Sequence, residues 1–200
     1  KLDAETFADP ELAQRFLDNE LSLHSMFDTG LFLIDHKGKL VAESPFRPER
    51  RGRDLSEREY FSQSAQLQKP YISKPYAAKR NNNEPALRMT TPIFDRQGHF
   101  LGILAGRLEL LGSNILSQIG KTQNGVGGYV FMTDSDGIMI LHPDQKRLLK
   151  TAVGANPLFD RGIRGFSGTG VVVNSYGKDM IMTIAHLQTT GWVLASNYPK

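Results

Sequence analysis

The sequence has no cysteine among its 200 residues. This absence excludes a disulfide framework, a thiolate metal site and a cysteine nucleophile, and it is compatible with a periplasmic location. No apolar run approaches the roughly 20 residues that span a bilayer, and there is no signal peptide. Because the chain starts abruptly at Lys1, inside a helical pattern, we expect a piece of a longer protein.

A strong excess of charge of either sign is also missing. Lysine and arginine number 24 against 21 aspartate and glutamate residues, for a net charge of +3, which is too small an excess to indicate nucleic-acid binding. The five histidines form neither an H-E-x-x-H word nor a close pair, so we expect no metal, no cofactor and no nucleic-acid partner. Acidic residues interrupt one local run of arginines, which is interpreted as a solvated loop. That run is Arg47, Arg50, Arg51 and Arg53.

The first half of the chain predicts a helix followed by hairpins. Asp9 is a good N-cap before Pro10, and the apolar spacing predicts a helix over residues 10–28. The words G-L-F-L-I-D-H and K-L-V-A-E-S predict two strands joined by a turn at 35–38. The elements expected next are a helix near 56–68 and strands near 71–76, 86–94 and 99–109.

The second half repeats this pattern. The word D-S-D-G at 134–137 takes the place that D-H-K-G has at 35–38. The elements expected after it are a helical region at 157–163 and strands at 170–174, 179–187 and 192–197. Runs of hairpins around a helix favour an antiparallel sheet with helices on one side. The sequence therefore predicts an α+β fold of two tandem modules, each with about five strands.

Several words, in this order, carry a resemblance to a known family. They are D-L-S-E-R-E-Y-F at 54–61, K-P-Y-I-S-K-P-Y at 69–76, T-P-I-F-D-R-Q-G-H-F-L-G-I-L-A-G-R-L-E-L at 91–110 and M-I-L-H-P-D at 139–144. Together with the order of elements, they resemble the double Cache sensor domains, the PAS-like tandem extracytoplasmic modules of bacterial transmembrane receptors. The closing segments, from Leu158 onward, are most similar to those of receptors that end in a GGDEF diguanylate cyclase.

The resemblance implies an organisation and a function. An N-terminal signalling helix at 1–29 continues from a transmembrane segment, and a membrane-distal module at 30–110 binds a small molecule. A connecting helix and loop at 111–127 lead to a membrane-proximal module at 128–200. The implied protein is a periplasmic sensor domain, not an enzyme, within a membrane-anchored receptor that signals as a homodimer.

The resemblance also implies ligand-binding residues in the distal module. Relatives that bind amino acids hold the ligand carboxylate with an R-x-W-Y word, and the matching residues here are Arg58, Tyr60 and Phe61. A guanidinium meets a carboxylate with two charge-assisted hydrogen bonds, and a phenol adds a neutral donor. The alternative is a capping box over Ser56 and Glu59, with Arg58 paired to glutamates and both aromatics in the core.

The other candidates lie in the strands that follow. Tyr76 stands at the position of a pocket tyrosine, whereas Ala78 and Arg107 stand where amino-acid binders carry the aspartates that hold the ligand ammonium. Without those carboxylates, and with Arg88 on the neighbouring strand, we expect a small carboxylate ligand without an amine. Exposed positions for Arg88 and Arg107 are the alternative. With Ser73, the candidate ligand-binding set is Arg58, Tyr60, Phe61, Ser73, Tyr76, Arg88 and Arg107.

Three other functions stay open at this point. The first is the sensor domain of a histidine kinase or chemoreceptor that binds an amino acid. The second is a small α+β hydrolase with a site built from Asp35, His36 and a later acid. The third is a structural module whose distal pocket is filled by side chains. In the second half, His142 and Asp144 are the best polar candidates and are interpreted as the end of a strand and the start of a turn.

Overall fold

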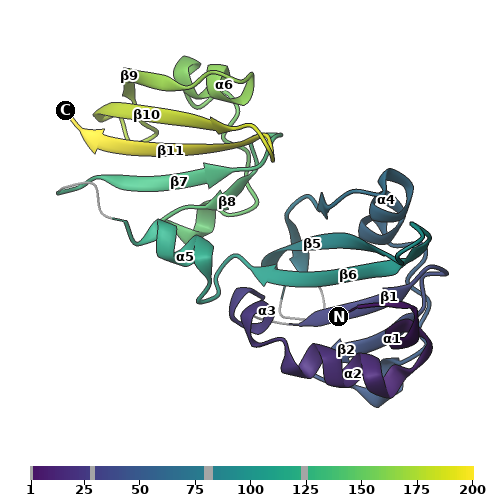
Figure 1. Ribbon diagram of the computed structural model, residues 1–200. Coiled ribbons are helices and arrows are strands. Elements are labelled where there is room, and N and C mark those ends of the chain that lie inside the picture. The colour runs from purple at the N-terminus through teal and green to yellow at the C-terminus, as the bar shows by residue number, and fades with distance from the viewer. Residues whose placement is uncertain (1, 28–29, 79–82, 123–125) are drawn as a thin grey trace. The chain divides into compact units, whose positions relative to one another are not determined.

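The computed structural model divides the chain into two compact units (Figure 1). The residues that it describes are 2–27, 30–78, 83–122 and 126–200. The first unit comprises residues 1–74 and 86–109, and the second comprises residues 75–85 and 110–200. One antiparallel sheet has six strands and the other has five. The predicted α+β fold with two tandem modules is therefore confirmed.

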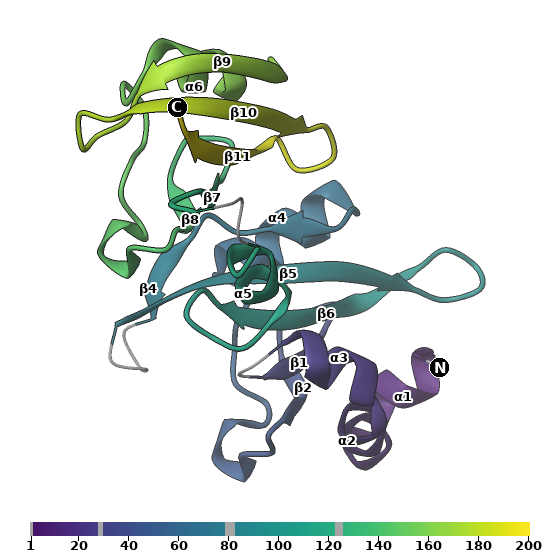
Figure 2. The same cartoon turned by 90° about the vertical axis from the view of Figure 1, so that its left-hand side faces the viewer.

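The first sheet orders its strands β2-β1-β6-β5-β3, and β4 pairs with β5 beside that path. The strands are β1 Leu31–Asp35, β2 Leu40–Ser44, β3 Tyr71–Ile72, β4 Tyr76–Ala78, β5 Glu84–Phe94 and β6 Phe100–Glu109. The helices are α1 Ala4–Ala8, α2 Pro10–Asn19, α3 Leu21–Met26 and α4 Glu59–Leu67, with the 3-10 helix η1 at Pro48–Arg50. Figure 2 shows α4 on one face of this sheet and α1 to α3 on the other.

Each face of the first sheet carries its own apolar core, because side chains alternate along a strand. On one face, Phe32 of β1 packs with Ala105 of β6 and Phe61 of α4. On the opposite face, Leu31 packs with Leu17 of α2. The face that carries Phe32 is called the α4 face below.

The N-terminal helix is interrupted, which corrects the prediction of one helix over 10–28. Asp9 caps α2 as expected, since its side chain accepts two backbone hydrogen bonds in the first turn. At Glu20 the N–H bonds to the Leu17 carbonyl and the backbone leaves the helical conformation, so α3 starts as a separate helix. Residue 28 lies outside the described residues. None of the described helices is both long and apolar enough to cross a membrane.

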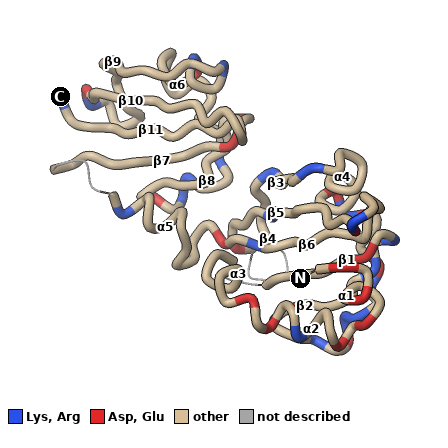
Figure 3. The backbone as a smooth tube through the Cα atoms, viewed as in Figure 1, with Lys and Arg blue, Asp and Glu red and all other residues tan. Residues whose placement is uncertain are grey.

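The second sheet orders its strands β8-β7-β11-β10-β9. The strands are β7 Tyr129–Thr133, β8 Met139–Leu141, β9 Gly168–Val173, β10 Asp179–Leu187 and β11 Trp192–Pro199. The helices are α5 Ile115–Gly120 and α6 Pro157–Ile163, with the 3-10 helix η2 at Gln145–Arg147. The connecting helix is shorter than expected, because Asn114 and Ser117 form a capping box at its start. Strands β7 and β11 carry no charged residue (Figure 3).

The two sheets correspond strand by strand, as the internal repeat predicts. The places of β2, β1, β6 and β5 in the first sheet are those of β8, β7, β11 and β10 in the second. In each unit one aspartate, Asp35 or Asp134, accepts hydrogen bonds from two backbone N–H groups of the turn that follows the first strand. Both hairpin turns are therefore set by the same local chemistry.

Candidate ligand-binding site

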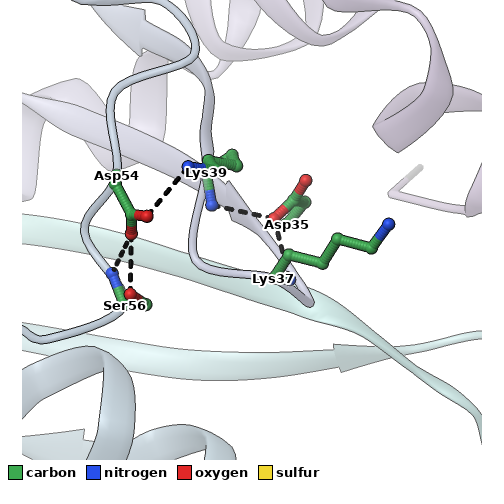
Figure 4. Close-up of polar contacts among 5 residues, drawn as sticks. All are labelled: Asp35, Lys37, Lys39, Asp54 and Ser56. Carbon is green, nitrogen blue, oxygen red and sulfur yellow. Dashed lines mark hydrogen bonds and ion pairs between the residues drawn. The ribbon is translucent and has the colours of Figure 1, made fainter.

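A tight loop sets the start of α4. Gly38 lies in the β1–β2 turn with a φ of +82°, and a Cβ there would fall 2.6 Å from the Cα of Ser56. Figure 4 shows Asp54 between two partners, the Lys39 ammonium at 2.8 Å and the N–H and hydroxyl of Ser56 at 3.0 and 2.7 Å. These hydrogen bonds lower the pKa of Asp54, and the bond from Lys39 has the largest effect. The backbone before α4 is thus held by the close approach of Ser56 to Gly38 and by the hydrogen bonds of Asp54.

Arg58 is the N-cap residue of α4 and not part of its first turn. The predicted capping box is not formed, because the Ser56 hydroxyl donates to Asp54 and Glu59 accepts a hydrogen bond from the Tyr71 hydroxyl at 2.7 Å. Burial and the Glu59 carboxylate raise the pKa of Tyr71 to about 12. In the described part of the chain, the exposed Arg58 guanidinium has no hydrogen bond or ion pair.

The two aromatic residues after Arg58 differ in their surroundings. Phe61 is buried in the core of the α4 face, whereas Tyr60 packs against that core and is half-buried. The Cζ of Arg88 lies 4.2 Å from the centroid of the Tyr60 ring and 5.0 Å from that of Phe32. Arg88 is therefore held by two aromatic faces, which attract a cation through their negative potential.

Arg88 and Arg107 point to the same face of the sheet. Arg88 pairs with Arg107 across β5 and β6, and two residues along the strands Thr90 pairs with Ala105. Ala105 belongs to the core of the α4 face. Because residues two apart on a strand share a face, both arginines point to the α4 face. The Arg107 side chain is only 16% exposed, and its Nη2 lies 2.6 Å from Oε1 of Glu109. The exposed position considered for Arg107 is therefore wrong. The Nε of Arg88 is buried and has no hydrogen-bond partner among the described residues.

A buried ion pair that sequence reasoning missed lies beside this cluster. Glu43 is directly opposite Phe32 across β1 and β2. Its side chain is 4% exposed, and its Oε2 lies 2.6 Å from Nη1 of Arg50, whose Cζ lies 5.6 Å from the Phe32 centroid. Burial raises the pKa of Glu43, and the Arg50 charge acts in the opposite sense. The arginine loop is thus not wholly solvated as predicted, because Arg50 folds onto the sheet.

Ser73 and Tyr76 do not join the Arg88 cluster. The Ser73 hydroxyl accepts the N–H of Arg88 at 2.9 Å and donates to the carbonyl of the next residue at 3.0 Å, so it secures the backbone of β5. Tyr76 lies on β4, in the stretch that is grouped with the second unit. Of the candidate set, the first unit brings Tyr60, Arg88 and Arg107 together.

The hydrolase site considered for Asp35 and His36 is not formed. Oδ1 of Asp35 accepts the N–H groups of Lys37 and Lys39 at 2.8 Å each, so the turn uses this carboxylate. The His36 side chain is exposed. Across residues 2–27, 30–78, 83–122 and 126–200, no three His, Cys, Asp or Glu residues form a group that could hold a metal ion.

A match to a protein-family model shows to which family this chain belongs. The model of the Cache domain, dCache_1, matches residues 2–200. The chain belongs to the Cache domain family. This membership confirms the resemblance to double Cache domains, and it confirms a sensor domain in place of an enzyme.

One relative of this Cache domain is a chemoreceptor. The methyl-accepting chemotaxis protein McpG of Pseudomonas putida is 23% identical over 175 residues, which are 84% of this chain and 26% of that protein. The chain thus spans about a quarter of that relative's length. This relative does not support the finer resemblance to receptors that end in a diguanylate cyclase.

Two solved structures show the same fold. The ligand-binding domain of the Pseudomonas aeruginosa chemoreceptor PctC, in complex with GABA, has a TM-score of 0.71 at 20% identity, over 94% of this chain and 81% of that chain. The domain of Pseudomonas fluorescens CtaA in complex with L-serine has a TM-score of 0.70 at 18% identity, over 96% and 81%. At this identity the likeness concerns the fold alone.

Proposed function

We propose that the first unit of this Cache domain binds a small organic carboxylate on its α4 face. The observation that carries this proposal is the charge balance there. Arg50 and Arg107 are each matched by an acid, Glu43 and Glu109, at 2.6 Å. Within the described part of the chain, Arg88 has no such acid. A half-buried guanidinium without a counter-charge is unfavourable until an anion joins it.

The groups around Arg88 suit a carboxylate. Two rings hold the guanidinium, so its planar fork loses little freedom when it donates two hydrogen bonds. Tyr60 offers a phenol donor beside it, and Arg58 offers a second guanidinium at the start of α4. The Phe32 ring is buried beneath Arg50 and Arg88, so it supports the guanidinium and not the ligand.

An amino acid is the second candidate ligand, and two observations favour it. The PctC and CtaA domains are complexes with GABA and L-serine. In addition, Oε1 of Glu43 is buried without a hydrogen-bond partner among the described residues, so it is able to accept one from a ligand ammonium. We prefer a carboxylate because Glu43 and Glu109 are each already paired with an arginine.

At the level of the whole receptor, we propose a periplasmic sensor domain in a membrane-anchored homodimer. Membership of the Cache family and the chemoreceptor relatives support the extracytoplasmic side. McpG favours a chemotaxis output, while the resemblance of the closing segments favours a diguanylate cyclase. In either receptor, the ligand changes the output only if it binds one arrangement of the domain better than the other.

Calorimetric titration of the 200-residue chain tests the ligand class. Propionate and succinate are compared with L-alanine, GABA and propylamine. The variant Arg88→Met keeps an apolar body between the rings and removes the charge, and Arg96→Met, in the exposed β5–β6 turn, is the matched control. We expect a carboxylate to bind, and we expect Arg88→Met alone to weaken that binding by about tenfold or more.

Two results would contradict this assignment. Binding of an amino acid with no response to either carboxylate would establish the second candidate ligand. Carboxylate binding that Arg88→Met leaves unchanged would show that the ligand does not use the α4 face.

A further inference from the structure

The second unit contains a cavity of about 630 Å³. Its walls come from β7, β8, β10 and β11, from α6, from the loop that follows β8 and from the β9–β10 turn. All of these elements belong to the second unit. The internal repeat relates this cavity to the α4 face of the first unit.

The β1–β2 and β7–β8 turns show which residues of the two units take the same place. Counted from the aspartate of each turn, Phe131 takes the place of Phe32, and His142 takes the place of Glu43. Both Phe131 and His142 line the cavity. The floor of the cavity is thus the counterpart of the surface on which Arg88 lies in the first unit.

Two further positions correspond. Arg147 takes the place of Arg50, since each arginine ends a short 3-10 helix, η2 or η1. Asn197 takes the place of Arg107, since each lies two residues beyond the alanine that pairs with the phenylalanine of the first strand. Where the first unit has a buried acid and a buried arginine, the second therefore has a histidine and an asparagine.

Asn197 is an unpartnered polar group in the wall of the cavity. Its side chain lines the cavity and is 1% exposed. Its Oδ1 has no hydrogen-bond partner among the described residues. Because a buried amide without a partner is unfavourable, this position points to a ligand that bonds to it. A carboxylate has no hydrogen to give to Oδ1, so it bonds to the Nδ2 amino group of Asn197, for which the described residues also supply no hydrogen bond.

His142 adds a hydrogen-bond donor. Its Nδ1 lies 2.9 Å from the N–H and 3.2 Å from the carbonyl oxygen of Asp144, and in the tautomer that accepts the shorter bond the proton of the neutral ring is on Nε2. In the part of the chain that is described, Nε2 has no hydrogen bond. Burial lowers the pKa of His142, and the Arg147 charge acts in the same sense. Both effects favour the neutral ring, which in this tautomer offers the N–H of Nε2.

The rim of the cavity is basic. Lys146, Arg147 and Lys150 line it from the loop after β8, against one lining carboxylate, that of Asp144. Nη2 of Arg147 donates to the Ser175 hydroxyl at 2.6 Å, and its Nε lies 3.8 Å from Asp144. Figure 3 shows that β7 and β11, which form the floor, carry no charge. A positive rim over an uncharged floor favours a small anion with an apolar body.

The floor is aromatic. The ring centroids of Phe131 and Phe159 lie 5.6 Å apart, and those of Tyr129 and His142 lie 5.5 Å apart. We propose that this cavity is a second ligand site, which takes a small monocarboxylate with an apolar or aromatic body. The carboxylate meets Asn197, His142 and Arg147, while the body packs on the rings. This site is independent of the site proposed for the first unit.

Calorimetric titration of the whole 200-residue chain with benzoate tests the proposal, and benzamide, which has the same shape without the charge, is the control ligand. We expect benzoate to bind and benzamide to bind at least about tenfold more weakly. Asn197→Leu and Arg147→Gln are each expected to weaken benzoate binding about tenfold, whereas Arg96→Met, at an exposed arginine outside both proposed sites, leaves it unchanged. Circular dichroism checks the fold, and Arg147→Gln, at a partly exposed residue, carries the test if Asn197→Leu does not fold.

Any of three results overturns the proposal. These are no binding of benzoate, equal binding of benzoate and benzamide, and benzoate binding that only Arg88→Met abolishes. The last result would locate the anion on the first unit instead. Failure of this site and failure of the first-unit site are therefore distinguishable.

Discussion

The two units share a strand order, yet they carry different chemistry on corresponding sheet faces. In the first unit, Arg50 and Arg88 lie over the Phe32 ring, and Glu43 is buried beside them. In the second unit, the matching face carries Phe131 and Asn197 under an open cavity. The repeated backbone sets where a site lies, and a few side chains set which ligand it accepts.

The two units also differ in how strongly their stability depends on a buried charge and its counter-charge. A buried carboxylate is tolerated only while a counter-charge stays beside it. The first unit has such a carboxylate in Glu43, whereas at the corresponding residue of the second unit, His142, burial lowers the pKa and favours the neutral ring. Substitutions at corresponding positions of the two units therefore separate the contribution of the shared backbone to stability from the contribution of the charges.

The largest difference is expected between Arg50→Met and Arg147→Met. Arg50→Met leaves Glu43 buried without its partner, and this type of loss costs about 3–5 kcal/mol of the free energy of unfolding. Arg147→Met removes an exposed hydrogen bond to Ser175 at 2.6 Å and a 3.8 Å contact to Asp144, which is 42% exposed, so the cost is about 1 kcal/mol. Urea unfolding followed by circular dichroism measures both.

The cost of Arg50→Met is also expected to depend on pH. Burial already raises the pKa of Glu43, and removal of the Arg50 charge raises it further. At about pH 4.5 the carboxyl is therefore largely protonated and the variant loses less stability than at about pH 7.5. A loss that is equal at both pH values would mean that Arg50 acts through its packing on Phe32.

An intermediate effect is expected at the two hairpin glycines. Gly38 and Gly137 have φ values of +82° and +77°, so alanine costs about 1–2 kcal/mol at either position. At Gly38 the new Cβ would fall 2.6 Å from a backbone atom of Ser56, which adds about 1–3 kcal/mol of overpacking. At Gly137 the nearest atom is a methyl group of Val153, whose side chain is able to turn away.

The unfolding free energies of Gly38→Ala and Gly137→Ala test this difference. Gly98→Ala is the control, because Gly98 has a φ of +88° and nothing within 4 Å of the new Cβ. We expect Gly38→Ala to cost the most and Gly98→Ala to show the backbone cost alone. Equal costs at all three positions would show that the loop before α4 is not held against the turn.

Sequence reasoning predicted the fold where the determinants are local. The turns at Asp35 and Asp134 depend on an acceptor side chain and a glycine, and both are visible in the sequence. The break at Glu20 was not predicted, because the apolar spacing of the helix continues through it. The α4 cap was wrong for a similar reason, since Ser56 bonds to Asp54 and not to the helix.

The site was harder to predict because its residues depend on strand register. The pairing of β1 and β2 shifts by one residue between Leu33 and Ile34. Alternation counted from Leu40, which packs on the α4 face, would send Glu43 to the opposite face. No residue type in K-L-V-A-E-S marks this irregularity. The cavity of the second unit was likewise missed, because His142 and Asn197 are far apart in the sequence and meet only in the sheet.

The smallest effect is expected in the response of the two units to pH, at the corresponding residues Glu43 and His142. Burial raises the pKa of Glu43 above its usual value of 4.5, so the stability that it contributes is present below about pH 4.5 and is lost as pH rises through the folded-state pKa. Burial lowers the pKa of His142 below its usual value of 6.5. Its contribution is therefore complete above about pH 6.5 and is lost as pH falls toward the folded-state pKa.

Glu43→Gln and His142→Gln, unfolded in urea at a series of pH values, test these opposite signs. Removal of His142 is expected to flatten the fall in stability below about pH 6.5, while removal of Glu43 changes the slope only above about pH 4.5. If His142→Gln keeps the slope of the unmodified chain, the imidazole is protonated equally in the folded and unfolded states. A ring with its usual pKa of 6.5 is still mostly neutral at pH 7 and keeps an N–H, so this outcome would leave the donor of the second cavity in place and would show only that burial does not hold the ring neutral at lower pH.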